Sequence, residues 1–160
     1  MLRRRDLFLV VPFALAKGQT IGRLMPKFHA KSLDGKVYNN QALQGKVLLI
    51  QYWATWCGFC RKDQPAVDKI AAEFRSQGLV VLAVNSGEDR IKVNEYLAKN
   101  PRAVNIVLEN DTNLGEIFAA PGFPKYVLVN RNGYIVGTQE GAGGTIALRD
   151  MLGNAGLRSA

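Results

Sequence analysis

The sequence predicts an α/β domain with a mixed central sheet flanked by helices. The apolar runs at residues 46–52 and 79–85 have the composition of strands covered by helices on both faces. Segments with helical spacing separate such runs, and strand, helix, strand repeats indicate a parallel sheet. Near the end of the chain, the turn Arg131-Asn132-Gly133 between residues 126–129 and 134–140 indicates an antiparallel hairpin, so the sheet is mixed.

The first half of the chain supplies a hairpin, a strand and a long helix. Asp34-Gly35 lies between two short runs within residues 28–38 and favours an N-terminal hairpin. Residues 60–77 have helical periodicity, and Gly78 ends that pattern. The apolar positions that recur on one face of this expected helix are Val67, Ile70, Ala71 and Phe74.

The second half adds further units before and after the late hairpin. We expect a helix at residues 89–99, a strand at 104–108 and a helix at 112–118. Thr145 has the chemistry of an N-cap and can begin a final helix that runs through Leu152. Residues 153–160 are expected to form a flexible, frayed tail.

Composition limits the classes of function that need to be considered. A chain of 160 residues can bury one hydrophobic core without disulfide staples, so its two cysteines are free for chemistry. A four-ligand zinc site would need further ligands, and the only histidine is His29, so we expect no metal and no cofactor. The formal net charge is +8, but the basic residues are scattered, which favours a solvated surface and no nucleic-acid partner.

Residues 1–16 have the pattern of an export signal peptide. Three arginines at positions 3–5 precede the apolar residues 7–15, and a small-x-small cleavage pattern ends at Ala16. We expect cleavage after Ala16, which leaves a domain at residues 17–152 outside the cytoplasm. The apolar stretch is much shorter than the roughly 20 residues that span a bilayer. An uncleaved membrane anchor, or a disordered or core-packed N-terminus, is the alternative.

Both cysteines, Cys57 and Cys60, follow the apolar run at 46–52, at the expected start of the long helix. The first sulfur there lies near unsatisfied backbone N–H groups and the positive end of the helix dipole, which favour its thiolate. The second sulfur, one turn later, can close a ring and expel the product thiol. The pattern is typical of a redox dithiol; a passive disulfide or a two-thiol metal handle is the alternative.

The same segment resembles the active-site signature of the TlpA/ResA-type thiol-disulfide oxidoreductases, bacterial thioredoxin-fold proteins that work outside the cytoplasm. The matching residues run Trp-Ala-Thr-Trp-Cys-Gly-Phe-Cys-Arg-Lys-Asp-Gln-Pro from Trp53 to Pro65, and Phe59 replaces the proline most common in the family. The resemblance extends over residues 22–152. It implies a thioredoxin-like fold with an N-terminal hairpin and a central helix-strand insertion.

The resemblance also assigns roles at the site. It implies that Cys57 is the nucleophile, that Cys60 is the resolving thiol, and that the two form a disulfide. Pro124 matches a cis-proline that faces the dithiol, where the backbone of Phe123 would pair with a substrate segment. A trans turn proline without contact to the sulfurs is the alternative.

Further residues of the motif have expected roles. Asp63 matches an acidic residue implicated in proton handling, although it could instead be a favourable anion in the first turn of the helix. Gln51 stands where thioredoxin has a buried aspartate and cannot titrate, so Asp63 leads as the proton-handling candidate. We expect the substrate-facing surface to include Trp56, Gly58 and Phe59.

These observations predict an exported thiol-disulfide oxidoreductase that reduces protein disulfides, for example in cytochrome c maturation. Its expected partners are disulfide-bearing envelope proteins and a membrane thiol electron donor, and the domain is expected to be a monomer. A thiol peroxidase is an alternative, but its Pro-x-x-x-Thr-x-x-Cys loop is missing because Thr55 is only two residues before Cys57. A Cu(I) carrier is another, since thiolates suit copper, but no Met or His cluster joins the cysteines.

Overall fold

The computed structural model describes residues 21–159, so the expected export signal at residues 1–16 lies outside the described residues. The helices are α1 (Gly58–Phe74), α2 (Arg90–Lys99), α3 (Leu114–Ile117) and α4 (Gly144–Gly153), with a 3-10 turn η1 (Arg75–Gln77) after α1. The strands are β1 (His29–Ser32), β2 (Val37–Asn39), β3 (Val47–Trp53), β4 (Leu79–Asn85), β5 (Asn105–Thr112), β6 (Lys125–Val129) and β7 (Ile135–Glu140).

The strands form one seven-stranded mixed sheet in the order β2-β1-β5-β4-β3-β6-β7. The neighbours β3, β4 and β5 are parallel, and every other pair in the sheet is antiparallel. Both the N-terminal hairpin β1–β2 and the late hairpin β6–β7 are present, as predicted. Since β3 and β4 pair from Val47↔Leu79 to Trp53↔Asn85, they end together at one edge of the sheet.

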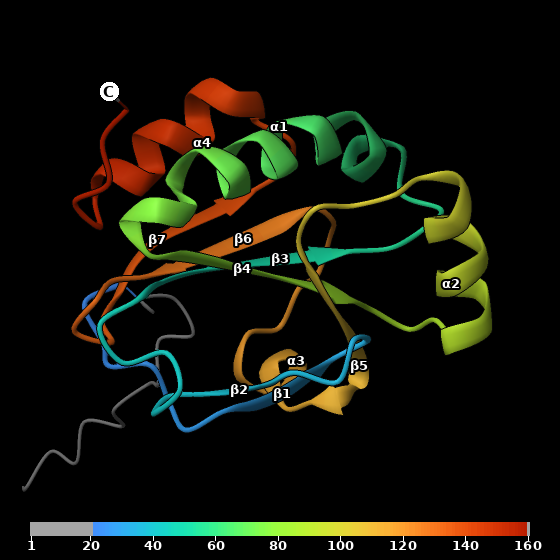
Figure 1. The fold of residues 1–160 in the computed structure, drawn as a ribbon, viewed down its shortest axis with the longest axis horizontal. Coiled ribbons are helices and arrows are strands. Elements are labelled where there is room, and N and C mark those ends of the chain that lie inside the picture. Colours follow the sequence, from blue (N-terminus) through green and yellow to red (C-terminus); the bar gives the residue numbers. More distant parts are fainter. Residues whose placement is uncertain (1–20, 160) are drawn as a thin grey trace, which may run out of the picture.

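Helices cover both faces of the sheet (Figure 1). On one face, α1 and α4 lie side by side, and their apolar side chains pack on Val47 and Leu49 of β3. On the other face, Leu114 at the start of α3 packs with Leu48 and Ile50. All seven residues of β3 are buried, which is the burial that its continuous apolar run predicts.

Helix α1 follows the predicted helical pattern, with the predicted apolar face in the core. It begins at Gly58 because Cys57 has an extended backbone and its Sγ accepts a hydrogen bond from the N–H of Cys60 at 3.1 Å. It ends before Gly78, whose φ of 87° is in the left-handed region that glycine adopts without a steric penalty. The helix therefore runs from the sheet edge where β3 ends back to the start of β4.

The segment after the predicted strand at 104–108 differs from expectation. β5 continues to Thr112 because its end pairs with β1, with Ala30 opposite Thr112. The Oγ1 of Thr112 also donates to the carbonyl of His29 at 2.6 Å. The helix expected at 112–118 is consequently reduced to the single turn α3.

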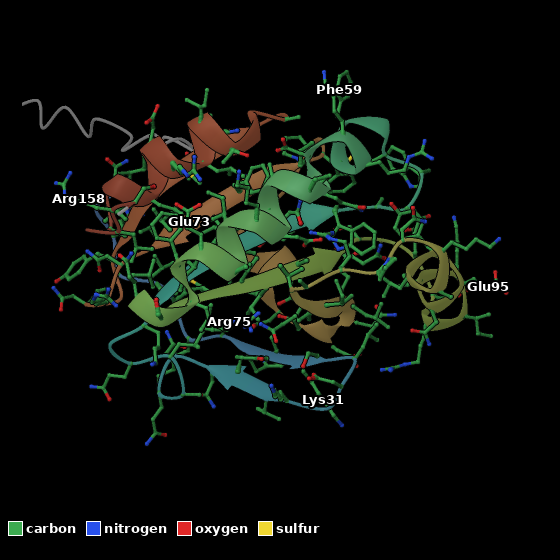
Figure 2. All side chains as sticks on the ribbon, turned by 45° about the horizontal axis from the view of Figure 1, so that its top comes forward. Lys31, Phe59, Glu73, Arg75, Glu95 and Arg158 are labelled. Atoms are coloured by element: carbon green, nitrogen blue, oxygen red, sulfur yellow. A yellow bond between two sulfur atoms is a disulfide. The ribbon has the colours of Figure 1, made fainter. Side chains whose placement is uncertain are left out.

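Residues 157–159 of the tail expected to fray at 153–160 make contacts with the rest of the domain. Leu157 is only 2% exposed and packs in the core between α1, α4 and the sheet. Arg158 exchanges two backbone-to-side-chain hydrogen bonds with Gln77, and Ser159 Oγ donates to Glu73 at 2.8 Å. Figure 2 shows Arg158 at the end of the molecule opposite Phe59. The burial of one leucine after a glycine-rich turn is a tertiary effect that local composition does not reveal.

Candidate active site

The dithiol lies where β3 ends and α1 begins. Cys57 and Cys60 are joined by a disulfide bond, as the resemblance implied. Cys57 is 5% exposed and Cys60 is fully buried. A short turn between Trp53 and α1 is closed by a hydrogen bond from the N–H of Cys57 to the carbonyl of Ala54 at 3.2 Å. Of the two sulfurs, the one that caps the helix is therefore the one nearer to solvent.

Large apolar side chains surround the disulfide on the outside. Trp56 and Phe59 are 65% and 68% exposed, and Phe59 projects outward from the start of α1 (Figure 2). The Trp56 ring meets the half-buried ring of Phe123 edge-on, with centroids 5.9 Å apart. The Phe123–Pro124 peptide bond is cis. Exposed apolar residues that gather at one place are typical of an interaction surface.

A groove of about 540 Å³ adjoins this apolar surface. Its walls come from the first half of α1 and from the loop between β7 and α4. The residues that line it are Phe59, Lys62, Asp63, Pro65, Ala66, Ala142, Gly143, Gly144 and Thr145. A larger groove of about 690 Å³ lies between Met25, Leu43 and Val129, and it includes none of the predicted site residues.

Asp63 is 2% exposed and connects α1 to the start of α4. Its carboxylate accepts hydrogen bonds from the hydroxyl of Tyr126 at 2.6 Å and from the N–H groups of Gly144 at 2.8 Å and Gly143 at 3.4 Å. α4 begins at Gly144, so Asp63, and not the predicted Thr145, caps this helix. Asp63 also lies beyond the first turn of α1, which corrects that alternative. The proton-handling role of Asp63 stays a prediction.

A chain of buried polar side chains continues from Asp63 beneath α1. Burial and the hydrogen bond to Asp63 raise the pKa of Tyr126 well above its usual range, so its hydroxyl stays protonated. Gln51 donates to that hydroxyl at 3.3 Å and accepts from Arg102 at 3.2 Å. Arg102 pairs with Asp68 at 3.0 Å, and its side chain is only 1% exposed. The buried amide of Gln51 is therefore bonded to a buried cation.

Arg102 was not predicted from the sequence as a site residue. Its guanidinium lies over the ring of Trp53, 5.8 Å from the ring centroid, which is a cation–π geometry. Its partners Asp68 and Gln51 are 34 and 51 residues away in the sequence. Contacts over such separations depend on the tertiary fold, so no local signal pointed to this residue.

Glu88, in the loop between β4 and α2, is a second residue near the site that was not predicted from the sequence. Its carboxylate accepts from the N–H of Thr55 at 2.7 Å, from the hydroxyl of Thr55 at 2.5 Å and from the side-chain amide of Asn85 at 2.8 Å. Lys92 forms an ion pair with it at 2.8 Å. One signal was present in the sequence: Glu88 follows a strand parallel to β3, and site residues of α/β sheets gather where such strands end.

Within residues 21–159, no three or more His, Cys, Asp or Glu side chains form a group that could hold a metal ion. His29 is exposed on β1, at the sheet edge formed by the β1–β2 hairpin. In the same part of the chain, no helix has both the length and the apolar character needed to cross a membrane.

The sheet order and the dithiol at the start of α1 define a thioredoxin-like oxidoreductase. The chain belongs to the Redoxin family, whose model matches residues 20–152. It is 29% identical over 124 residues to the thiol-disulfide oxidoreductase ResA of Bacillus subtilis, covering 78% of this chain and 69% of that protein. It is 36% identical over 120 residues to the thiol:disulfide interchange protein DsbE of Escherichia coli K12, covering 72% of this chain and 62% of that protein.

A solved structure gives the same result for the fold. A Chlorobium tepidum protein assigned as a thiol:disulfide interchange protein DsbE matches with a TM-score of 0.76 and 25% identity. The match covers 84% of this chain and 96% of that one. The predicted fold class, the family resemblance and the class of enzyme are all confirmed: the protein is a thioredoxin-like thiol-disulfide oxidoreductase.

Proposed function

We propose that this protein works outside the cytoplasm and reduces disulfide bonds of envelope proteins by dithiol exchange at Cys57 and Cys60. The observation that carries the proposal is the position of the sulfurs. The Cys57 sulfur caps α1 and is the more exposed of the two, whereas Cys60 is fully buried one turn later. This arrangement suits attack by the first sulfur and resolution by the second.

The exchange transfers two electrons from the reduced dithiol to the substrate. The thiolate of Cys57 attacks one sulfur of the substrate disulfide, which forms a mixed disulfide and releases one substrate thiolate. Cys60 then loses its proton and attacks the Cys57 sulfur, which forms the Cys57–Cys60 bond and releases the second substrate thiolate. Both released thiolates take up protons. A membrane thiol electron donor reduces the Cys57–Cys60 bond and completes the cycle.

The apolar surface and the groove support a protein substrate. An extended segment would contact Trp56, Phe59 and Phe123 on the outside of the disulfide, and Gly58 adds no side chain above it. A Cβ at Gly58 would meet no heavy atom within 4 Å apart from its chain neighbours and its own helix backbone, so the space beside this residue is open. The groove beside Phe59 extends this contact region toward the β7–α4 loop.

The reducing direction and the cellular setting are proposals that rest on the family. The relatives named ResA and DsbE support reduction of envelope protein disulfides, for example during cytochrome c maturation. The export pattern at residues 1–16 supports a location outside the cytoplasm.

A trapping experiment tests the proposal. Cys60→Ser removes the resolving thiol, so substrate proteins should accumulate as mixed disulfides on Cys57 when the variant is expressed in its own cell envelope. The double variant Cys57→Ser/Cys60→Ser is the matched control and should trap nothing. Equal recovery from both variants would overturn dithiol exchange, and a reduction potential near that of the strong oxidants, about −120 mV, would overturn the reducing direction.

A further inference from the structure

We propose that Glu88 is a positioning residue of the dithiol: its carboxylate holds the turn that carries Cys57 and places a fixed negative charge behind it. The inference deepens the proposed function and rests on it, because it concerns how readily Cys57 forms the attacking thiolate. Glu88 belongs to a different loop from the cysteine motif, and its hydrogen bonds to the motif go to Thr55.

The contacts of Glu88 join three elements at the edge of the sheet. One carboxylate oxygen accepts from the N–H of Thr55 and from the side-chain amide of Asn85 at the end of β4. The other accepts from the hydroxyl of Thr55 and from Lys92 on α2. Since Thr55 is two residues before Cys57, the carboxylate fixes the turn from which α1 begins.

The backbone that carries Glu88 is itself fixed to the turn. Trp53 and Asn85 are partners in the parallel β3–β4 ladder. The next residue, Ser86, donates its N–H to the carbonyl of Trp53 at 3.0 Å. The sheet therefore fixes the position of the loop that carries Glu88. Because its backbone is held in place, the Glu88 carboxylate can hold the turn at Thr55 firmly.

The charge of Glu88 is shielded from water. Its side chain is 3% exposed, whereas that of Lys92, the cation that pairs with it, is 56% exposed. Burial raises the pKa of Glu88, but hydrogen bonds from Lys92, Thr55 and Asn85 outweigh it and lower the pKa to about 2. The carboxylate is consequently ionised throughout the range in which thiols titrate.

A buried anion bound to Thr55, two residues before the attacking Cys57, opposes the formation of a second anion. The start of α1 favours the thiolate of Cys57, and the carboxylate of Glu88 moderates that effect. Stabilisation of the reduced form makes a dithiol protein more oxidising. If Glu88 makes the Cys57 thiolate less stable, the reduction potential of the protein becomes more reducing. The position of Glu88 thus agrees with the reducing direction proposed above.

The test compares thiolate reactivity in reduced wild-type protein and in Glu88→Gln, which has the same shape but no charge. We expect the rate of alkylation of Cys57 by iodoacetamide near pH 6 to rise about threefold to tenfold, and its pH profile to move to lower pH. The equilibrium with glutathione should shift toward the dithiol by a similar factor. Glu73→Gln is the matched control, since it removes another paired carboxylate at the far end of α1 and should change neither quantity.

A second variant keeps the test informative if Glu88→Gln does not fold. Lys92→Met removes the exposed countercharge and leaves the carboxylate in place, so the alkylation rate near pH 6 should fall about twofold. Unchanged alkylation profiles in both variants, or shifts in the same direction, would overturn the inference. The alkylation readout needs no substrate protein, so failure of the wild type to exchange with any protein disulfide would count against the proposed function and not against this role of Glu88.

Discussion

Two buried carboxylates belong to elements that adjoin the dithiol, and they have different partners. Glu88, in the β4–α2 loop, binds the turn before Cys57 and forms an ion pair with Lys92. Asp63, in α1, binds the hydroxyl of Tyr126 and the first N–H groups of α4. Within residues 21–159, Asp63 is in no ion pair and has no hydrogen bond to either sulfur.

The difference shows what each region contributes. The carboxylate of Asp63 accepts hydrogen bonds from backbone N–H groups at a helix N-terminus, and these contacts join the two helices that cover one face of the sheet. The contacts of Glu88 join a loop to the active-site turn. We therefore expect substitutions at Asp63 to act mainly on folding stability, and those at Glu88 to act on the reactivity of Cys57 as well.

The largest expected effect follows Asp63→Ala. The change leaves the Tyr126 hydroxyl and the start of α4 without their buried acceptor, so the free energy of unfolding should fall by about 4 kcal/mol. Urea unfolding followed by circular dichroism measures it. Asp63→Asn keeps one acceptor oxygen and should cost about half as much. A loss in the free energy of unfolding below about 0.5 kcal/mol in Asp63→Ala would contradict the role of Asp63 in joining α1 to α4.

The next effect is a pH dependence at Glu88. The pKa of this group is lowered from 4.5 to about 2 in the folded protein, so between these values the unfolded chain binds more protons. Its contribution, up to about 3 kcal/mol, is present above about pH 4.5 and is lost as the pH falls through 2. Urea unfolding near neutral pH and near pH 3 should show the stability difference between wild type and Glu88→Gln becoming smaller. A stability difference that does not depend on pH would contradict the stabilising role of the ionised Glu88 carboxylate.

A smaller effect is expected for Tyr126→Phe. This change removes the hydroxyl between Asp63 and Gln51 but leaves Asp63 its backbone donors on α4, so the loss in the free energy of unfolding should be about 1.5 kcal/mol. The same urea experiment measures it. If Tyr126→Phe cost as much as Asp63→Ala, the helix junction would depend on the hydroxyl and not on the cap.

The smallest effect is expected for Lys92→Met. The lysine is more than half exposed, and exposed ion pairs contribute little, so unfolding should change by less than about 0.5 kcal/mol. Glu88 keeps its donors from Thr55 and Asn85 in this variant. A loss above about 1 kcal/mol would show that the lysine, and not the turn, is the main partner of Glu88 in folding.

Local pattern was sufficient for most of the fold. Two repeating patterns were visible in the sequence: the apolar run of β3 and the helical spacing of Val67, Ile70 and Phe74. Each pattern arises because the apolar side chains of that element are buried in the core. The pairing of β1 with the extended end of β5 was not predictable in this way. Residues 30 and 112 are far apart in the sequence, and neither segment alone has a pattern that indicates the other as its partner. The N-terminal hairpin had its own turn signal at Asp34-Gly35, and the family resemblance identified the central insertion.

The same distinction between local patterns and long-range contacts applies to the residues of the candidate active site. The spacing of Cys57 and Cys60 and their place after a strand indicated a redox dithiol, and the family resemblance implied their disulfide. Helical spacing put Asp63 on the face of Cys60, but spacing gives a direction and not a partner, and the partners on β6 and α4 are more than 60 residues away. Glu88 and Arg102 act through contacts between loops and elements distant in sequence, so their roles became visible only in three dimensions.

The burial of Leu157 has a practical consequence for handling the protein. Arg158, near the last described residue, is hydrogen-bonded to Gln77 of η1, at the opposite end of α1 from the sulfurs. Carboxypeptidase trimming should therefore stall at this leucine, and a linker to a bead or dye continuing from Ser159 would leave the Trp56 and Phe59 surface free to meet other proteins. Baits for the trapping experiment are best immobilised at that end.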